Sequence, residues 1–496
     1  MEGLIGLVHG LGVALALENI PYAVIGCMVG MLVGVLPGIG QSTGMVLLIP
    51  ITFHLSPTGA IIMLSCIYYG AAYGGTLTSV LMNVPGESET VVTTFDGHPM
   101  ARQGRGGIAL GIAAIGSFIG GVSATIALAL LAVPLGRLAL RLGPSEYFSL
   151  MLLGLTLAVS LLGRSAIKGI IMVLFGLLLT QVGMDSQLGM ARLTFGQVGL
   201  MDGIPLLAII IGFFGLSDVL LSVFRSSESA TTLAPVSRIL PQRSDLKESA
   251  GPIARGSIVG FALGILPGMA NSVSTFCSYI LEKRLSRTPE RFGQGAIAGV
   301  AGPETANNAF ANAAFLPLLT LGIPTSAALS ILFGAFRIHG IAPGPLLFRE
   351  HPDVAWGLIS SMIVGNAILL VFSLPMLRLW LLVLRIPPAV LGAAIVTFSM
   401  IGMYSVNNST FDLMILALFA LIGAGLKLAD YPLAPALLAF ILGDKIEAAL
   451  RQSLTIAQGD ATVFFTRPIS AFLLACAAII FVVSILTLRR PMREED

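Results

Sequence analysis

Two short polar segments of this chain combine a helix break with groups that can bind a carboxylate or a sodium ion. They read LPGIGQSTG (36–44) and LPGMANSVS (266–274), and each interrupts an apolar run. Proline removes a backbone donor and glycine permits unusual φ angles, so a helix can stop and restart there. The restarted half-helix presents free N–H groups and the positive end of its dipole, which suit a carboxylate. Backbone carbonyls freed at the break suit Na⁺.

The two segments belong to a longer repeat. Residues 26–42 and 256–272 are 230 residues apart and are identical at eight of seventeen positions. A single break of this kind is more often a proline kink with small residues for helix packing. A matched pair, each followed by an amide and a serine, instead predicts the binding site of a transporter. The breaks are Pro37 and Pro267, and the predicted substrate-binding residues around them are Gly38, Gly40, Ser42, Thr43, Gly268, Asn271, Ser272 and Ser274.

A second pair of breaks follows the first, in LMNVPGESET (81–90) and LGIPTSAALS (321–330). Here an apolar run ends at Pro85 or Pro324, and small polar residues come next. The two segments correspond at few positions beyond the proline, chiefly Val84 and Ile323. The residues predicted to complete the site are Asn83, Gly86, Ser88, Thr325 and Ser326. The acidic residues of the first segment, Glu87 and Glu89, can alternatively lie solvated at a membrane surface.

The second half also contains a polar stretch within a helix of small residues, AGPETANNAFANAAF (301–315). Glu304 and Asn307 are three positions apart, so they share a helix face. Polar residues inside a membrane are costly and are usually functional. Hydrogen bonding between helices is an equally good interpretation of the whole polar set, which consists of Glu304, Asn307, Asn308 and Asn312. No metal site is firmly assigned, but Na⁺ is expected near Ser42, Ser272 and Asn307.

The elements that must carry these breaks are membrane helices. The 496 residues are 56% hydrophobic and only 10% charged, whereas a soluble domain has about a quarter of its residues charged. Apolar runs of membrane-spanning length recur along the whole chain. The fold class predicted is therefore an all-α integral membrane protein with about twelve transmembrane helices, several of them broken or re-entrant at the Leu-Pro-Gly motifs.

The repeat divides the chain into two membrane halves, 1–224 and 256–450, followed by a C-terminal segment, 451–496, with the last transmembrane helix. Between the halves, 225–255 is a polar segment with an excess of Lys and Arg, which predicts a cytoplasmic linker. The turn after the second break, 281–293, is rich in Lys and Arg, whereas the matching 51–59 has neither. This difference predicts that the halves are inverted repeats.

Signatures of enzymes are missing from the sequence. It has no HExxH zinc motif and no phosphate-binding GxxxxGK[ST] loop. An intramembrane aspartyl protease would need two facing aspartates, and the candidates Asp412 and Asp444 each sit beside a predicted helix end. The prediction is that the protein is not an enzyme and holds no cofactor.

Long motifs make the chain resemble one family of membrane proteins. They are GVLPGIGQSTG (34–44), YYGAAYGGTLTSVLMNVPGESETVVTTFDGHPMARQGRGG (68–107), AGPETANNAFANAAFLPLLTLGIPTSAAL (301–329) and LGDKIEAALRQSLTIAQGDATVFFTRPIS (442–470). With them, the chain resembles the large membrane subunit of the tripartite tricarboxylate transporters, the TctA type.

The resemblance implies an ion-coupled symporter that imports small di- or tricarboxylates across the bacterial inner membrane. It implies two protein partners, a small four-helix membrane subunit (TctB type) and a periplasmic solute-binding protein (TctC type). Na⁺ or H⁺ would be the coupling ion. A passive carboxylate channel remains the alternative, because the same breaks can line a selectivity filter.

Overall fold

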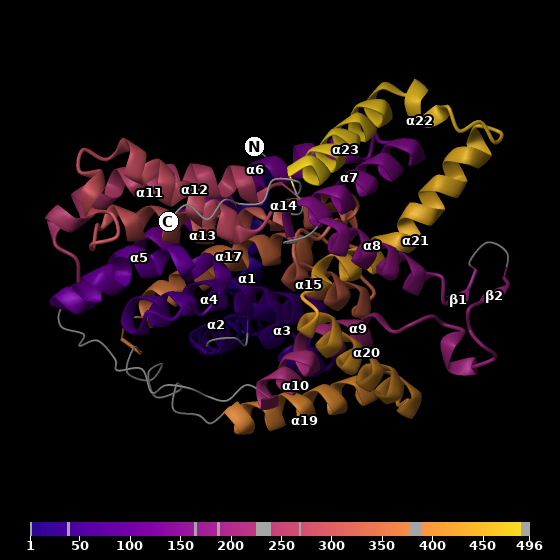
Figure 1. Ribbon diagram of the computed structural model, residues 1–496, viewed down its shortest axis with the longest axis horizontal. Helices are drawn as coiled ribbons and strands as arrows, with labels where there is room; N and C mark the ends of the chain where they lie inside the picture. The colour runs from indigo at the N-terminus through magenta and orange to yellow at the C-terminus, as the bar shows by residue number, and fades with distance from the viewer. Residues whose placement is uncertain are drawn as a thin grey trace.

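The fold is given by a computed structural model that describes residues 2–36, 40–162, 166–185, 189–224, 240–266, 269–373, 375–376 and 388–487. Pro37, Gly38, Pro267 and Gly268 lie outside the described residues. The described chain is almost entirely helical, with one two-stranded antiparallel ribbon in which Gly183 pairs with Arg192. Figure 1 shows this ribbon at one end of the molecule and helices α11, α12 and α13 at the other.

The elements of the first half, in chain order, are α1 (Glu2–Ala14), α2 (Ile20–Val35), α3 (Gly40–Thr52), α4 (Pro57–Met82), η1 (Ser88–Thr90), α5 (Val91–Met100), η2 (Ala101–Arg105), α6 (Gly106–Ala139), α7 (Pro144–Leu162), α8 (Ala166–Thr180), β1 (Gly183–Met184), β2 (Ala191–Arg192), η3 (Val198–Leu200), α9 (Leu206–Ile211), η4 (Gly212–Leu216) and α10 (Ser217–Phe224). Those of the second half are α11 (Arg243–Gly264), α12 (Asn271–Leu285), η5 (Pro289–Arg291), α13 (Ala298–Ala313), α14 (Phe315–Leu321), α15 (Ala327–Ile338), α16 (Leu347–Glu350), α17 (Pro352–Ser373), α19 (Pro388–Asn407), α20 (Thr410–Leu428), α21 (Leu433–Ile456), α22 (Val463–Thr466) and α23 (Pro468–Thr487).

Helix α4 lies at the centre of the first half. Pro57 occupies its first turn, where a missing N–H costs nothing, and the Ser56 side chain accepts a hydrogen bond from the Gly59 N–H at 3.2 Å. From Gly59 to Leu81 every residue of the helix is buried. A helix that is covered on all sides needs small residues at its contacts, because only these let other backbones come close.

The glycines shared by the repeat make these close contacts. Helix α2 packs on α4, and a Cβ added at Gly26 would lie 2.6 Å from the Cys66 Cβ. Helix α11 packs on α13 in the same way, and a Cβ at Gly260 would lie 2.7 Å from the Ala309 Cβ. Part of the repeated pattern therefore serves helix packing and not ligand binding.

Each Leu-Pro-Gly break joins two helices that pack together, α2 with α3 and α11 with α12. The second pair is held at its far end by a buried ion pair. The Arg255 guanidinium donates to both carboxylate oxygens of Glu282, at 2.8 and 2.5 Å, and the Glu282 side chain is almost completely buried. Since Arg255 precedes the break and Glu282 follows it, α12 folds back along α11.

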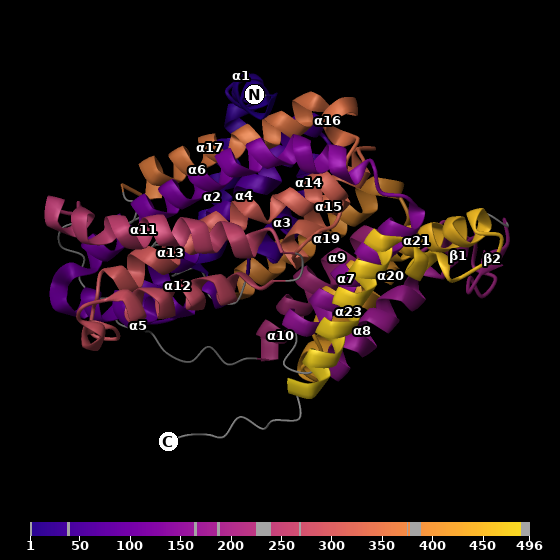
Figure 2. The ribbon, with the colours of Figure 1, turned by 90° about the horizontal axis from the view of Figure 1, so that it is seen from above.

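Outside this centre, the last helices of each half pack against helices of the other half. Helix α21 contacts α7 and α8, while α9, η4 and α10 contact α20. In both views α7, α8 and α23 form one group beside α21, away from α11, α12 and α13 (Figures 1 and 2).

Four described helices are long and apolar enough to cross a membrane, and seven more apolar helices are 10–17 residues long. Together they agree with a multi-pass membrane protein. Several predicted spans are short because the chain breaks within them, as at α14 and α15. Of the predicted linker 225–255, residues 243–255 form the start of α11, and 225–239 lie outside the described residues.

A buried aspartate fixes the end of α5 to the loop before α13. The Asp96 carboxylate accepts hydrogen bonds from the Tyr279 hydroxyl at 3.0 Å and from the N–H groups of Gly293, Gly295 and Ala296 at 2.8–2.9 Å. With four donors, its charge is well compensated despite complete burial. This contact joins the two halves of the chain.

Candidate functional site

The first break leaves a helix N-terminus that is filled by the protein's own carboxylate. Helix α3 begins at Gly40, whose φ of +61° is a left-handed conformation that glycine adopts without strain. The next residue, Gln41, donates its backbone N–H to Glu87 Oε1 at 2.5 Å. Its side-chain Nε2 lies 3.4 Å from Glu89 Oε1. The group at this terminus is therefore a carboxylate, as the sequence predicts, but it comes from the chain itself.

The surface interpretation of the two glutamates is wrong for this structure. The Glu89 residue is 4% exposed and Glu87 is half-buried. Ser88 donates to Glu89 Oε2 at 3.1 Å, and η1, which carries both residues, contacts α12. Segment 83–90 therefore lies between the two Leu-Pro-Gly hairpins.

The second break connects three helices through two amides. Asn271, the first residue of α12, donates its Nδ2 to Asn307 Oδ1 at 2.6 Å. Asn307 in turn donates its Nδ2 to the Ala72 carbonyl of α4 at 3.1 Å. Asn271 Oδ1 and the hydroxyl of Ser274, one turn along α12, have no hydrogen-bond partner among the described residues. Buried polar groups of this kind are normally satisfied, so these two are free to bind a ligand or water.

The second pair of breaks has a common local geometry. Asn83 at the end of α4 and Gly322 at the end of α14 are both left-handed, with φ of 57° and 69°. Each is followed by Val-Pro or Ile-Pro, which extends the weak correspondence of the two segments. A Cβ added at Gly86 would lie 2.6 Å from the Gly75 Cα, so this position needs glycine.

The hydroxyls after Pro324 serve the chain locally. Thr325 donates to the Ala314 carbonyl at 3.3 Å, and the Ser326 side chain caps α15 by accepting from the Leu329 N–H at 3.2 Å. Helix α15, which follows this break, also contacts α4.

One predicted residue, Thr43, forms its side-chain contacts away from this centre. The Thr43 hydroxyl donates to the Phe214 carbonyl at 2.6 Å and lies 3.5 Å from Asp218 Oδ2, so it serves packing of α3 on η4 and α10. Asp218 forms an ion pair with Lys427 at 2.6 Å. The Ser272 carbonyl accepts from Thr275, and Ser42 is half-buried on the first turn of α3. The predicted role of Thr43 in substrate binding is therefore not supported by its position.

The sequence marks one further acid, Glu304, as a polar residue within a membrane helix, but does not count it among the substrate-binding residues. Glu304 on α13 is 1% exposed and accepts hydrogen bonds from the hydroxyls of Thr76, at 2.7 Å, and Thr93. No Lys, Arg or His forms an ion pair with it among the described residues. An acidic residue in the middle of a small-residue membrane helix is a functional candidate by default.

Asn271 and Asn307, two of the predicted residues, belong to a continuous set of contacts. It runs from the N-terminus of α3 through η1 to α12, and from there through Asn307 to α4 and the cap of α15. Neutral amides, hydroxyls and two glutamates make up this set, with no group of three or more His, Cys, Asp or Glu suited to a metal among the described residues. Such an arrangement suits reversible binding of an anion or a monovalent cation better than bond-breaking chemistry.

Comparison with known proteins agrees with this geometry. The model of the tripartite tricarboxylate transporter TctA family matches residues 20–438. The chain belongs to this family. It is a component of a transporter and a multi-pass membrane protein. No solved structure matches it.

Two relatives come from Agrobacterium vitis. An uncharacterized 52.8 kDa protein in the TAR-I ttuC' 3'region is 44% identical over 495 residues, covering 100% of this chain and 99% of its own length. An uncharacterized protein in the TAR-II ttuC' 3'region is 44% identical over 236 residues, 48% of this chain and 98% of its own length.

Proposed function

We propose that this chain is the large subunit of an ion-coupled symporter that imports small di- or tricarboxylates across the bacterial inner membrane. Its partners would be a small four-helix membrane subunit and a periplasmic solute-binding protein. The observation that carries the proposal is that helices beginning after the breaks of both halves, α3 and α12, lie close to α4 and to segment 83–90. Family membership supports the transport class, and the N-terminus of α3 supports the carboxylate, because it already accommodates that of Glu87.

The substrate would bind by exchanging places with Glu87. A carboxylate of the substrate offers the same oxygen acceptors to the Gln41 N–H as Glu87 does. The free Oδ1 of Asn271 and the free hydroxyl of Ser274 are directed by α12, which contacts the same segment. The exchange would leave Glu87 uncompensated, and such a cost makes binding easily reversible.

The coupling ion would bind next to this region, at Glu304 or Asn307. A carboxylate held by two hydroxyls can take up a proton, or it can bind Na⁺ with the help of the threonine oxygens. Either H⁺ or Na⁺ would neutralise the buried negative charge of Glu304. This lowers the free-energy cost of moving that carboxylate through the membrane together with an anionic substrate.

Alternating access would follow from two halves of opposite orientation. The repeated Leu-Pro-Gly hairpins and the contrast in Lys and Arg between 51–59 and 281–293 support inverted repeats. The packing of α2 on α4 and of α11 on α13 supports an equivalent role for the two hairpins. Rocking of one half against the other would then open the site first to one side and then to the other.

Reconstitution of the three-component complex in proteoliposomes tests the proposal. Uptake of radiolabelled succinate, malate and citrate is measured with and without imposed Na⁺ and H⁺ gradients. We expect one gradient to drive accumulation above equilibrium, and the substitutions Pro37→Ala and Pro267→Ala to impair it while the protein stays in the membrane. Uptake that only reaches equilibrium would favour the passive channel. Absence of uptake for the whole panel, or normal uptake by the double mutant, would overturn the proposal.

A further inference from the structure

Two neighbouring cavities share the side chain of Lys445, on α21. The larger, of about 600 Å³, is bordered by β1, the end of α8 and α21. The smaller, of about 480 Å³, is bordered by α7, residues 321–323 and α21. Residues Lys445 and Ala448 line both of them. This part of α21 played no role in the site described above.

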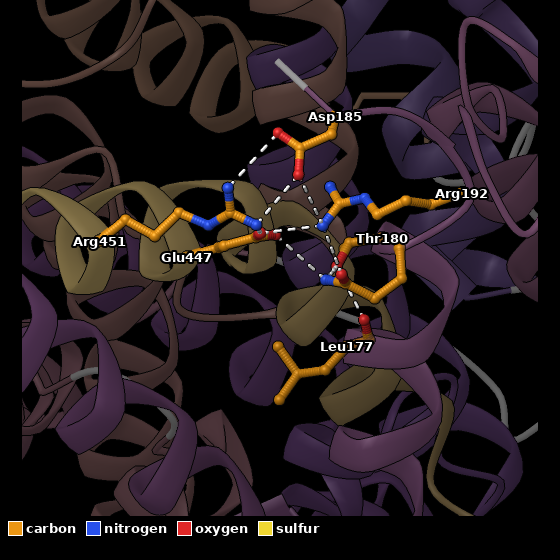
Figure 3. Close-up of polar contacts among 7 residues, drawn as sticks. Leu177, Thr180, Asp185, Arg192, Glu447 and Arg451 are labelled. Carbon is orange, nitrogen blue, oxygen red and sulfur yellow. Dashed lines mark hydrogen bonds and ion pairs between the residues drawn. The ribbon is translucent and has the colours of Figure 1, made fainter. Parts of the chain in front are cut away.

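The arginines of the larger cavity are already neutralised. Figure 3 shows Arg192 and Arg451 pointing toward the carboxylates of Asp185 and Glu447. Arg451 lies 3.0 Å from Asp185 and 2.5 Å from Glu447, while Arg192 lies 2.9 Å from Glu447. Two positive charges are therefore matched by two negative ones. This network stabilises the packing of β1 and β2 on α21 and leaves no arginine charge for a ligand.

Lys445 differs from these arginines because it has no anionic partner. Within the described chain its Nζ forms no hydrogen bond and no ion pair, and it lies over the Phe333 ring, with the centroid 4.8 Å away. The neighbouring carboxylate, Asp444, lies beyond ion-pair distance and interacts with Arg192 and Arg337 instead. The charge of Arg337 also acts on Lys445. The Lys445 side chain is exposed, and apart from the Phe333 ring the described chain gives its ammonium no partner. Its charge is therefore available to an anion that enters the cavity.

The ammonium lies directly beside a helix break. Gly322, with φ of +69°, ends α14 immediately before Ile323 and Pro324. A Cβ added at Gly322 would lie 3.3 Å from Lys445 Nζ and 2.5 Å from the Pro343 carbonyl oxygen. Glycine is thus required by its left-handed backbone and by the close approach of the Pro343 carbonyl, with the Lys445 ammonium just beyond. The smaller cavity therefore leads from Lys445 to the break that carries Thr325 and Ser326.

We infer that Lys445 is the anchor of a carboxylate-binding subsite in the smaller cavity. Lys445 is the only charged side chain among its described lining residues, and most of the others are apolar. The Gln452 amide adds N–H donors, and the volume falls within the range of small-ligand pockets. One carboxylate of the substrate would pair with the ammonium, and the carbon chain of the substrate would lie against the apolar wall, close to the Pro324 break. This inference rests on the proposed function and adds an intermediate binding position for the substrate during transport.

Direct binding to the purified full complex tests this subsite. Wild-type protein is first screened with succinate, malate and citrate by isothermal titration calorimetry, and the tightest ligand becomes the probe. We expect Lys445→Met to weaken its Kd by about 10- to 100-fold, the effect of losing a hydrogen bond to a charged group. Lys445→Arg should retain most of the affinity, because it restores the charge. The matched control Lys283→Met, at the exposed end of α12, should bind as wild type.

Three results would overturn the inference, and they separate it from the proposed function. If wild type binds and transports the probe and Lys445→Met binds it equally well, the subsite is wrong and the transport proposal stands. If no panel member binds to or is transported by wild type, both fail together. If Lys445→Met keeps its affinity for the probe but loses an anionic lipid that copurifies with wild type, detected by mass spectrometry, the ammonium binds a lipid phosphate. Unchanged thermal stability of the variants excludes misfolding as the cause of lost binding.

Discussion

Replacing Glu87 by glutamine should make the transporter bind its substrate more tightly. In the structure the Glu87 carboxylate accepts from the Gln41 N–H at 2.5 Å, at the N-terminus where a substrate carboxylate is proposed to bind. The substrate must displace this internal competitor, so the free energy of the internal contact is subtracted from that of binding. Glutamine keeps the shape of the side chain but makes it a weaker competitor.

The size of the effect follows from this contact. A hydrogen bond to a charged group contributes about 1.5–3 kcal/mol, and a neutral one about half as much. The loss of the favourable charge at the helix terminus adds about 0.5 kcal/mol. Glu87→Gln should therefore remove about 1.5 kcal/mol of competition, which corresponds to an approximately tenfold lower Kd.

Calorimetric titration of the purified complex with its best carboxylate measures this change. Two variants serve as controls. Glu290→Gln, on the exposed turn η5, should leave Kd unchanged. Glu89→Gln removes the same charge nearby but leaves the Gln41–Glu87 contact in place, so its effect should stay below about threefold, or 0.7 kcal/mol. If Glu87→Gln leaves Kd unchanged or raises it, the exchange mechanism is refuted. Equal tightening by both variants would refute it as well, because the cause would then be net charge.

Three further perturbations test the fold and the site. Asn271→Ala removes the donor to Asn307 and should reduce uptake at least tenfold, with about 1–2 kcal/mol lost from the free energy of unfolding; wild-type uptake would contradict its role. Asp96→Ala leaves four donors without their acceptor and should destabilise the protein by at least about 3 kcal/mol in a thermal or denaturant assay, whereas a loss below 1 kcal/mol would not fit a clamp between the halves. Gly86→Ala forces a Cβ against Gly75 and should lower the melting temperature by several degrees. Its control, Gly12→Ala, has open space around the new methyl group and should be neutral or stabilising, and equal effects of the two would count against the packing argument.

Much of the site could be predicted because the helix breaks are encoded locally. Helices α2 and α11 end at Val35 and Gly264, two and three residues before Pro37 and Pro267, and α3 begins at Gly40. These ends depend on residues a few positions apart, so the sequence is enough to find them. The same reasoning could not predict the partner of the Thr43 hydroxyl, the Phe214 carbonyl, because that contact depends on how α3 packs against η4 and α10.

The partners of these breaks could not be predicted in the same way. Gln41 and Glu87 are 46 positions apart, and Asn307 and Ala72 are 235 positions apart. Their proximity depends on how the hairpins and the central helices pack. That packing uses glycine and alanine contacts, and these residues are so frequent along the chain that the sequence does not indicate which of them meet. Lys445 is a still clearer case, because its sequence context indicates only a helix with charged residues.

By itself, the sequence determined that this protein is a helical membrane protein of the TctA family, interrupted at repeated Leu-Pro-Gly motifs. Composition and backbone chemistry suffice for this, since an apolar run must be helical in lipid and a Pro-Gly pair must interrupt it. Only the tertiary structure decided what fills each interruption: Glu87 at the start of α3, Asn307 at the start of α12 and the ammonium of Lys445 beside the end of α14. The physical reason is the separation of the interacting residues along the chain. Neighbouring residues decide where a helix ends, but the group that binds its free terminus comes from a distant part of the sequence and is brought there by tertiary packing.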